Sequence, residues 1–312
     1  MEYINLGTSD LRVSRLCVGG CPMGGYGWGR VEKQDLIGSV QEALEQGVNF
    51  FDTADTYGLG ESERTLGTAL QGKRHHAIIA TKFGVRVEKT TTYYDNTPEW
   101  IERALAESLK RLQTDYIDLY QIHYRDEKTP LEDVVEALRR LKKKGYIRYF
   151  GLSNIYEKDI LEFSKLKSEF VSFQDEYSLA CRTNESSICL LKRELELTPL
   201  TWGSLGQGVL SGKYDETTVF NADDRRSREV YVNFHGEKMK HNLKIVSELK
   251  EISIETGKSI PAIAIRFIMD HLVDSAVLVG VKRPDQLYSN LEALNWKLSD
   301  GQMNRLLEVS RC

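Results

Sequence analysis

Four side chains that can hold or move a proton follow apolar segments of the chain. Asp52 and Tyr57 stand in NFFDTADTYG (residues 49–58), Lys82 ends the run AIIATK, and His123 follows YIDLYQI. A tyrosine phenol has a reference pKa of about 10, but an ammonium group beside it favours the phenolate, and a histidine can orient or relay the proton. We expect Asp52 to pair with Lys82 and hold it beside Tyr57, which then acts as the acid. A purely structural ion pair is the alternative for Asp52 and Lys82.

The elements that position these side chains alternate along the chain between apolar runs and segments of helical periodicity. A hairpin is expected first, from EYINLG and LRVSRL, joined by turn residues. The segments expected as strands are 16–19, 48–52, 77–81, 116–121, 147–151, 170–174, 198–203 and 275–280. Helical periodicity marks 33–46, 61–70, 98–112, 131–145, 156–166, 188–196, 237–257 and 260–271.

Eight strands that are each followed by helical material predict parallel strands with helical crossovers. We therefore expect one domain over residues 1–312, an α/β fold of the (β/α)8 TIM-barrel type with an N-terminal β-hairpin and a C-terminal helical extension. An open doubly wound sheet is the alternative, supported by the glycine cluster GGCPMGGYGWG at 19–29. No G-x-G-x-x-G leads from the strand expected at 16–19 directly into a helix, which argues against the doubly wound sheet. A barrel collects its active site at the C-terminal ends of the strands, where the four candidates stand.

Composition excludes several classes of function. Of 312 residues, 41% are hydrophobic and 28% charged, which is typical of a folded chain with a large core. The net charge of -4, with no basic patch, argues against a nucleic-acid partner. The polar start MEYINLGTSDLRVSRL and the lack of a run of roughly 18 apolar residues favour a cytoplasmic protein with no membrane partner.

The cysteines and histidines do not predict a metal site. The 5 cysteines are widely spaced, without a CxxC pair or a Cys/His cluster, so we expect free thiols and no metal. The sequence also lacks an evident Ser/His/Asp or Cys/His catalytic set. The proposed acid therefore needs a partner that carries the harder chemistry, and hydride transfer from a nicotinamide fits.

Six ordered segments resemble the aldo-keto reductase superfamily, most closely its bacterial general-stress and potassium-channel-β-like branches. They are FFDTADTYGLGESERTLG, ATKFG, DYIDLYQIH, GYIRYFGLSN, PLTWGSLGQGVLSGKY and LVGVKRPDQLYSNLEAL, within a match from about Tyr3 to Leu294. The resemblance implies a catalytic tetrad of Asp52, Tyr57, Lys82 and His123. In this tetrad, Tyr57 is the general acid and Lys82, paired with Asp52, lowers the pKa of Tyr57. His123 orients the substrate carbonyl.

The resemblance also implies a cofactor site. Ser153, Asn154 and Gln174 match positions that bind the nicotinamide carboxamide, Trp202 matches an aromatic that stacks beneath the ring, and GSLGQGVLSGK (203–213) matches a pyrophosphate strap. The residues expected to bind cofactor are Gly20, Asp52, Ser153, Asn154, Gln174, Trp202, Gly203, Ser204, Leu205, Gln207, Gly208, Lys213, Gly280, Lys282, Arg283, Gln286 and Asn290.

Lys282 and Arg283 bear on the choice of cofactor. They precede Pro284, which stands at an expected helix start, and a helix N-terminus beside basic side chains is an anion site. We therefore expect NADP(H), through its 2'-phosphate, over NAD(H). Gln207 stands where relatives often carry arginine, which weakens the expected grip on the pyrophosphate.

The expected function is reduction of an aldehyde or ketone to an alcohol, with a small carbonyl compound as the partner. A cofactor-sensing binding subunit with slow turnover is the alternative. Selectivity is expected in the irregular loops 85–98, 123–130 and 212–236, and Asp55 is expected to be a turn or capping residue. The residues expected to contact substrate are Met23, Tyr26, Trp28 and Tyr124.

Overall fold

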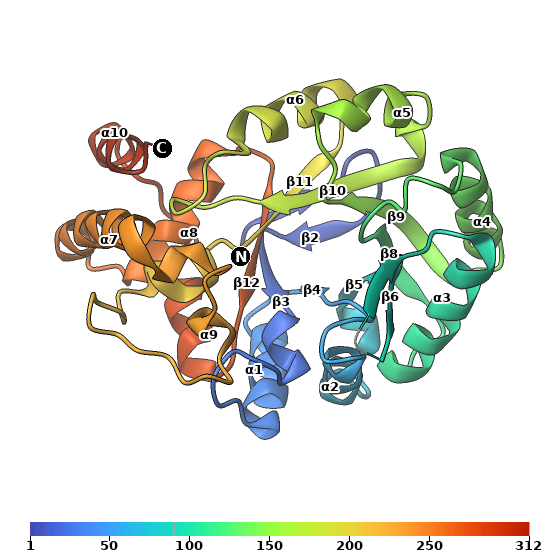
Figure 1. Ribbon diagram of the computed structural model, residues 1–312, viewed down its shortest axis with the longest axis horizontal. Helices are drawn as coiled ribbons and strands as arrows, with labels where there is room; N and C mark the ends of the chain where they lie inside the picture. Colours follow the sequence, from blue (N-terminus) through green and yellow to red (C-terminus); the bar gives the residue numbers. More distant parts are fainter. Residues whose placement is uncertain (90, 312) are drawn as a thin grey trace.

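The computed structural model describes residues 1–89 and 91–311, and a closed barrel of parallel strands forms its centre (Figure 1). Around the ring the strands are β3 (Leu16–Gly19), β4 (Phe50–Asp52), β5 (Ile78–Phe83), β8 (Ile117–Ile122), β9 (Ile147–Ser153), β10 (Phe170–Glu176), β11 (Thr198–Trp202) and β12 (Ala276–Gly280). Pairing of β12 with β3 closes the ring. The (β/α)8 barrel expected from the sequence is confirmed.

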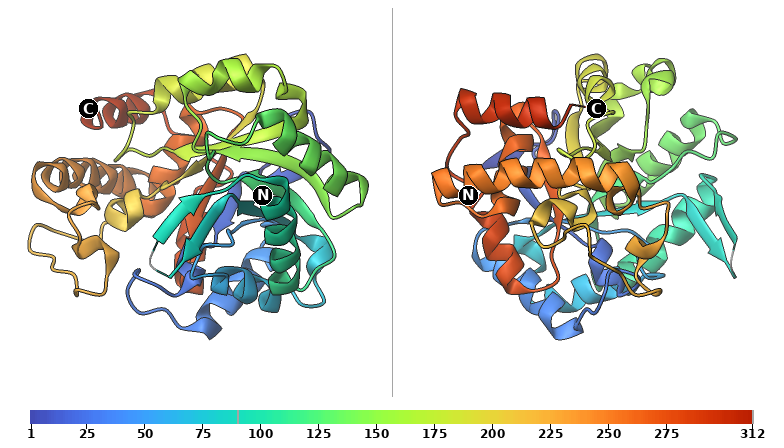
Figure 2. Two further views of the ribbon diagram at one scale, coloured as in Figure 1. Left: turned by 45° about the vertical axis from the view of Figure 1, so that its right-hand side comes forward. Right: turned by 60° about the vertical axis from the view of Figure 1, so that its left-hand side comes forward.

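Helices surround the barrel (Figures 1 and 2). They are α1 (Lys33–Glu45), α2 (Glu61–Ala69), α3 (Pro98–Leu112), α4 (Leu131–Lys143), α5 (Ile160–Ser164), α6 (Glu185–Leu195), α7 (Gly236–Thr256), α8 (Ile260–His271), α9 (Pro284–Leu291) and α10 (Asp300–Val309). Helix α10 follows the last barrel strand, packs against α7 and forms the expected C-terminal extension.

Apolar side chains fill two layers, one inside the ring and one between strands and helices. Successive strand residues point to opposite faces, so Phe50 packs inside the ring while Phe51 packs toward the helices, and both are 0% exposed. The inner layer also holds Cys17, Ala80 and Leu119. The apolar side chains fill the interior of the ring, and the polar candidates Asp52 and Lys82 lie at the C-terminal ends of their strands.

The N-terminal hairpin closes one end of the barrel. Its strands β1 (Tyr3–Asn5) and β2 (Arg12–Ser14) pair antiparallel, as expected. Leu6, Leu11 and Val13 from the hairpin join the inner apolar layer. The opposite end, where the strands have their C-termini, is therefore the open mouth.

The structure differs from the expectation over residues 85–98, which we expected to be an irregular loop. Instead, β6 (Val85–Glu88) and β7 (Thr91–Tyr94) form an antiparallel hairpin that projects from the barrel (Figure 2, right). Valine, threonine and tyrosine favour strands, and the Arg86 guanidinium lies 4.9 Å from the centre of the Tyr93 ring across the pair. The expected irregular loop was therefore wrong here.

A second difference concerns the helix expected over residues 156–166. Only α5 is α-helical there, with 3-10 turns at Glu157–Asp159 and Lys167–Glu169 on either side. The Asp159 carboxylate accepts a hydrogen bond from the Tyr156 backbone N–H at 2.8 Å, and such side-chain bonds compete with regular helix.

Residues 212–236 are largely irregular, as expected, with 3-10 turns at Arg225–Ser227 and Val232–Phe234. This segment extends from the side of α7 toward the glycine-rich loop that precedes α1 (Figure 1). Among the residues described, no helix has the length and apolar character needed to cross a membrane.

Candidate active site

A buried ion pair between Lys82 and Asp52 lies at the mouth of the barrel. Lys82 Nζ donates to Asp52 Oδ1 at 2.6 Å and to the Thr53 carbonyl at 2.9 Å, and both charged side chains are almost fully buried. β4 ends at Asp52, and Lys82 is the penultimate residue of β5, so the barrel register brings them together. The expected pairing is confirmed.

The second Asp52 oxygen is held by two glutamines. Asp52 Oδ2 accepts hydrogen bonds from Gln121 Nε2 at 3.0 Å and from Gln174 Nε2 at 2.8 Å. Gln121 was missed in the sequence, although it stands two residues before His123 and that spacing places alternate strand residues on one face. Gln174, expected at the nicotinamide carboxamide, thus directs its amide nitrogen to Asp52 in this structure.

Tyr57 lies beside the ammonium group of Lys82. Lys82 Nζ is 3.4 Å from the Tyr57 hydroxyl and 5.0 Å from the centre of its ring. Burial, followed by the negative charge of Asp52, raises the pKa of Tyr57 well above its usual value. This direction is opposite to the lowering expected from Lys82, because burial is the largest effect and the charge of Asp52 also raises the pKa. Tyr57 is therefore a neutral phenol, which is the form that donates a proton.

His123 follows β8 and faces the Tyr57 ring. Their ring centres are 6.1 Å apart and the planes are nearly perpendicular, while the Tyr124 ring stacks on the imidazole with centres 5.1 Å apart. Burial and the charge of Lys82 hold the pKa of His123 well below its usual value, so the imidazole is neutral. Its Nδ1 is buried and has no hydrogen-bond partner among the residues described.

Asn154 connects the histidine to the neighbouring strands. Its φ of 53° is left-handed, and its backbone N–H donates to the Gln174 carbonyl at 2.9 Å. Its side-chain nitrogen donates to the His123 carbonyl and to Ser153 Oγ, both at 3.0 Å. Ser153, Asn154 and Gln174 therefore lie side by side at the ends of β9 and β10.

The loop after β11 forms a turn rich in left-handed backbone. Gln207 has a φ of 54° and Gly208 a φ of 106°, within the 3-10 segment Gly206–Ser211. Gln207 donates to Glu176 Oε1 at 3.1 Å and accepts from Asn233 at 2.6 Å, so its side chain ties this loop to residues 212–236. The Ser204 hydroxyl points inward, to the carbonyls of Thr201 and Leu278.

Cationic side chains gather beside this loop. Burial and the charges of Arg226, Lys213 and Arg283, opposed by Asp224, lower the pKa of Lys282 to about 8. Lys282 Nζ donates to the Trp28 carbonyl, and its backbone N–H donates to Gln286 Oε1 at 2.9 Å. A bound anion would relieve the repulsion among these cations.

The glycine-rich loop after β3 packs against the other strand ends. A Cβ at Gly20 would stand 2.6 Å from Ser62 Oγ, and one at Gly280 would stand 2.8 Å from Pro22 Cγ. Both glycines are therefore needed for close packing. Of the expected substrate contacts in this loop, Tyr26 is exposed and Trp28 partly exposed, but Met23 is 1% exposed. Met23 packs in the core, which contradicts its expected place on the substrate surface.

Asp55 is a turn residue, as expected: it lies in the turn that the Tyr57 backbone N–H closes by donating to the Ala54 carbonyl at 3.2 Å. Its Oδ1 is buried and has no hydrogen-bond partner among the residues described. Burial, followed by repulsion from Glu63, raises the pKa of Asp55 to about 8. The nearby Arg111 bonds Glu63 at 2.5 Å, and its charge offsets the effect of burial on Asp55 only in part.

This raised pKa predicts a pH dependence of stability. The folded state keeps the Asp55 proton up to about pH 8, whereas an unfolded aspartate loses it near a pKa of about 4. Stability from this group is complete below about pH 4 and is lost as the pH rises to about 8. In wild type, Asp55 should therefore lower the free energy of unfolding between pH 5 and 8, by at most about 1.4 kcal/mol per pH unit. Asp55→Asn should remove this contribution and show a shallower pH dependence.

Urea unfolding at each pH measures this effect. Asp115→Asn, at an exposed aspartate, is the matched control and should keep the wild-type slope. Equal slopes for wild type and Asp55→Asn would contradict the assignment.

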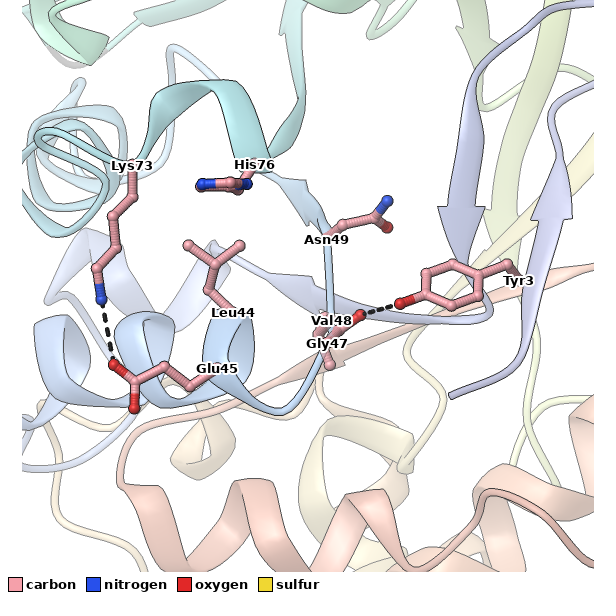
Figure 3. Close-up of a pocket in the computed structure, with 8 residues that line it drawn as sticks. All are labelled: Tyr3, Leu44, Glu45, Gly47, Val48, Asn49, Lys73 and His76. Carbon is pink, nitrogen blue, oxygen red and sulfur yellow. Dashed lines mark hydrogen bonds and ion pairs between the residues drawn. The ribbon is translucent and has the colours of Figure 1, made fainter.

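Neither a metal cluster nor a depression elsewhere on the described surface competes with this site. The described part of the chain contains no group of three or more His, Cys, Asp or Glu side chains placed to hold a metal. A depression of about 390 Å³ lies at the opposite, N-terminal end of the barrel (Figure 3). There Tyr3 donates to the Gly47 carbonyl at 2.8 Å, and Lys73 pairs with Glu45 at 3.1 Å. None of Asp52, Tyr57, Lys82 and His123 lines this depression, so we place the chemistry at the mouth.

Fold and site together define a parallel (β/α)8 barrel with a lysine, a carboxylate, a tyrosine and a histidine assembled at its C-terminal mouth. The model of the aldo/keto reductase family matches residues 15–311, and the chain belongs to that family. It is therefore an oxidoreductase of the aldo-keto reductase type.

Individual relatives are similar to this chain over nearly its whole length. The chain is 33% identical over 314 residues to the aldo-keto reductase YhdN of Bacillus subtilis, covering 99% of this chain and 94% of that one. It is 30% identical to the NADH-specific methylglyoxal reductase of Escherichia coli, covering 99% and 98%. The structure of a glycerol dehydrogenase from Gluconobacter oxydans superimposes with a TM-score of 0.88 at 30% identity, covering 98% and 94%.

Proposed function

We propose that this oxidoreductase reduces an aldehyde or ketone to an alcohol, with a nicotinamide cofactor as hydride donor and Tyr57 as proton donor. The observation that carries the proposal is the Lys82 ammonium, which touches Asp52 at 2.6 Å and Tyr57 at 3.4 Å at the barrel mouth. That arrangement couples a neutral phenol to a fixed positive charge.

The residues present fit a nicotinamide dinucleotide. A cationic cluster is formed by Lys213, Lys282, Arg226 and Arg283. Burial, followed by repulsion from the other cations, lowers the pKa of Lys282, and such a cluster suits phosphate groups. We infer that the loop 203–213 would hold the pyrophosphate, Trp202 would stack on the nicotinamide, and Ser153 and Asn154 would bind its carboxamide. Gln174 would need to exchange its bond to Asp52 to take part.

A cofactor bound there would supply a hydride to the carbonyl carbon. Tyr57 would donate its proton to the carbonyl oxygen, and Lys82 would stabilise the phenolate that remains. Asp52, held by Gln121 and Gln174, keeps Lys82 in place. His123 is neutral because its pKa is lowered, so one ring nitrogen can donate a hydrogen bond to the substrate oxygen.

Steady-state oxidation of NADPH and of NADH, over a panel of aldehydes, ketones and sugars, tests the proposal. We expect turnover with NADPH to exceed that with NADH, because the cationic cluster suits an additional phosphate. Negligible turnover with both cofactors across the panel, together with tight cofactor binding, would contradict catalysis and support a cofactor sensor. The NADH-specific relative makes NADH the necessary comparison.

In the same assay, Lys282→Ala identifies the source of the cofactor preference. We expect KM for NADPH to rise about tenfold, as for loss of a charged hydrogen bond, and KM for NADH to stay within about twofold. Lys297→Ala, at an exposed lysine, is the control. An equal rise in both KM values would contradict recognition of the 2'-phosphate by Lys282.

A further inference from the structure

The glycine-rich loop and the segment 212–236 contact each other at the edge of the barrel mouth. The Arg225 backbone N–H donates to the Gly27 carbonyl at 2.9 Å, and Arg228 donates to the Tyr26 hydroxyl at 3.1 Å. The Trp28 ring meets the Tyr231 ring edge to face, with centres 5.9 Å apart. The two segments therefore form one continuous wall beside the site.

Two aromatic rings hold the side chain of Arg225 within this wall. Its guanidinium carbon lies 4.9 Å from the centre of the Tyr26 ring and 5.9 Å from that of Trp28. Gly27, between these aromatics, leaves space for the arginine, since a Cβ there would stand 2.4 Å from Arg225 Cγ. Cation–π contacts fix the direction of the guanidinium but satisfy none of its N–H donors.

Arg225 differs from the adjacent arginine in having no acidic partner. Arg226 bonds both oxygens of Asp224, at 2.8 and 2.5 Å. In residues 1–89 and 91–311, no side-chain hydrogen bond or ion pair is formed by Arg225, although only part of its side chain is exposed. A shielded guanidinium with unsatisfied donors is a binding group for a carboxylate or phosphate.

The glycine-rich loop, which also carries Cys21, connects Arg225 to the catalytic residues. The positive charge of Arg225 and the Trp28 indole both favour the thiolate of Cys21, although burial is the largest effect and raises the pKa of this thiol. Cys21 in turn acts on Tyr57, whose pKa it helps to raise. The geometry of the glycine-rich loop agrees: a Cβ at Gly24 would stand 2.8 Å from the Tyr57 carbonyl carbon, and the Gly27 carbonyl accepts from the Arg225 backbone N–H at 2.9 Å. The same loop therefore contacts both Tyr57 and Arg225.

We propose that Arg225, held between Tyr26 and Trp28, determines specificity by binding an anionic group on the carbonyl substrate. This inference rests on the proposed carbonyl reduction and names its substrate class: aldehydes or ketones that carry a carboxylate or a phosphate. Arg225 binds that group while Tyr57 protonates the carbonyl oxygen, so the two contacts orient the substrate from its two ends.

Paired substrates that differ in charge but little in shape test this role. 4-Carboxybenzaldehyde is compared with methyl 4-formylbenzoate, and glyceraldehyde 3-phosphate with glyceraldehyde, so that carboxylate and phosphate are examined separately. Wild type should prefer the anionic member of at least one pair. For that pair, Arg225→Gln should lower kcat/KM about tenfold to hundredfold for the anion, mainly through KM, and alter the neutral member by less than about twofold.

Two further variants separate recognition from structural effects. Arg225→Lys keeps the charge and should retain part of the preference, while Arg193→Gln removes an exposed, distant charge from α6 and should change nothing. Thermal unfolding midpoints and cofactor Kd, from quenching of tryptophan fluorescence, should match wild type for all three variants.

Four results would overturn the inference. Equal losses on both members of each pair would show that Arg225 only holds the loops together. Weaker cofactor binding by Arg225→Gln would show that the anion bound by Arg225 is a cofactor phosphate. If wild type does not prefer the anionic member of either pair, Arg225 has no role in substrate specificity. If none of the four compounds is reduced while other members of the carbonyl panel are, the inference fails and the proposed function stands; if no member of the panel is reduced, both fail.

Discussion

Replacement of Tyr57 by phenylalanine is expected to lower kcat for carbonyl reduction about 10²- to 10⁴-fold, the range for loss of a general acid. Phenylalanine keeps the ring that faces His123 but removes the hydroxyl that lies 3.4 Å from Lys82 Nζ. The cofactor residues are untouched, so cofactor Kd should stay within about twofold of wild type. Steady-state kinetics and a fluorescence titration measure the two quantities.

Tyr146→Phe is the matched control for this substitution. Tyr146 is exposed, precedes β9 at the closed end of the barrel, and should tolerate loss of its hydroxyl without change in kcat. Unchanged turnover in Tyr57→Phe would refute the proposed mechanism. A large loss of cofactor binding in this variant would instead assign Tyr57 a role in the cofactor site.

Replacement of Lys82 by methionine is expected to remove activity and to destabilise the fold by about 3–5 kcal/mol, the usual cost of breaking a buried ion pair. The variant leaves Asp52, 2% exposed, with only the neutral donors of Gln121 and Gln174. Urea unfolding and steady-state kinetics measure the two effects.

The double variant Asp52→Asn/Lys82→Met tests the physical reason. It removes both charges, so we expect it to regain much of the stability lost in Lys82→Met while staying inactive, because stability needs only charge balance and catalysis needs the ammonium beside Tyr57. Wild-type stability in Lys82→Met would contradict the buried-pair assignment. Recovery of activity in the double variant would contradict the catalytic role of Lys82.

The sequence by itself determined the barrel and the approximate positions of its chemistry. Eight apolar runs separated by helical segments predict parallel strands, and the end of a barrel strand is a fixed location in space. Asp52, Lys82 and His123 were therefore expected at the mouth from their places in the chain, and the Asp52–Lys82 pair is confirmed at 2.6 Å. A local sequence pattern is enough to predict where a residue lies when the order of strands and helices determines its place in the fold.

Only the tertiary structure decided how these groups act, because burial and distances across the barrel are not local properties. It placed Gln121 and Gln174 on Asp52, from two other strands of the ring. It reversed the expected direction of the Tyr57 pKa, since burial is the largest effect and the charge of Asp52 also raises this pKa. The contact of Arg225 with Tyr26 joins residues about two hundred positions apart, and no spacing in the sequence encodes such a contact.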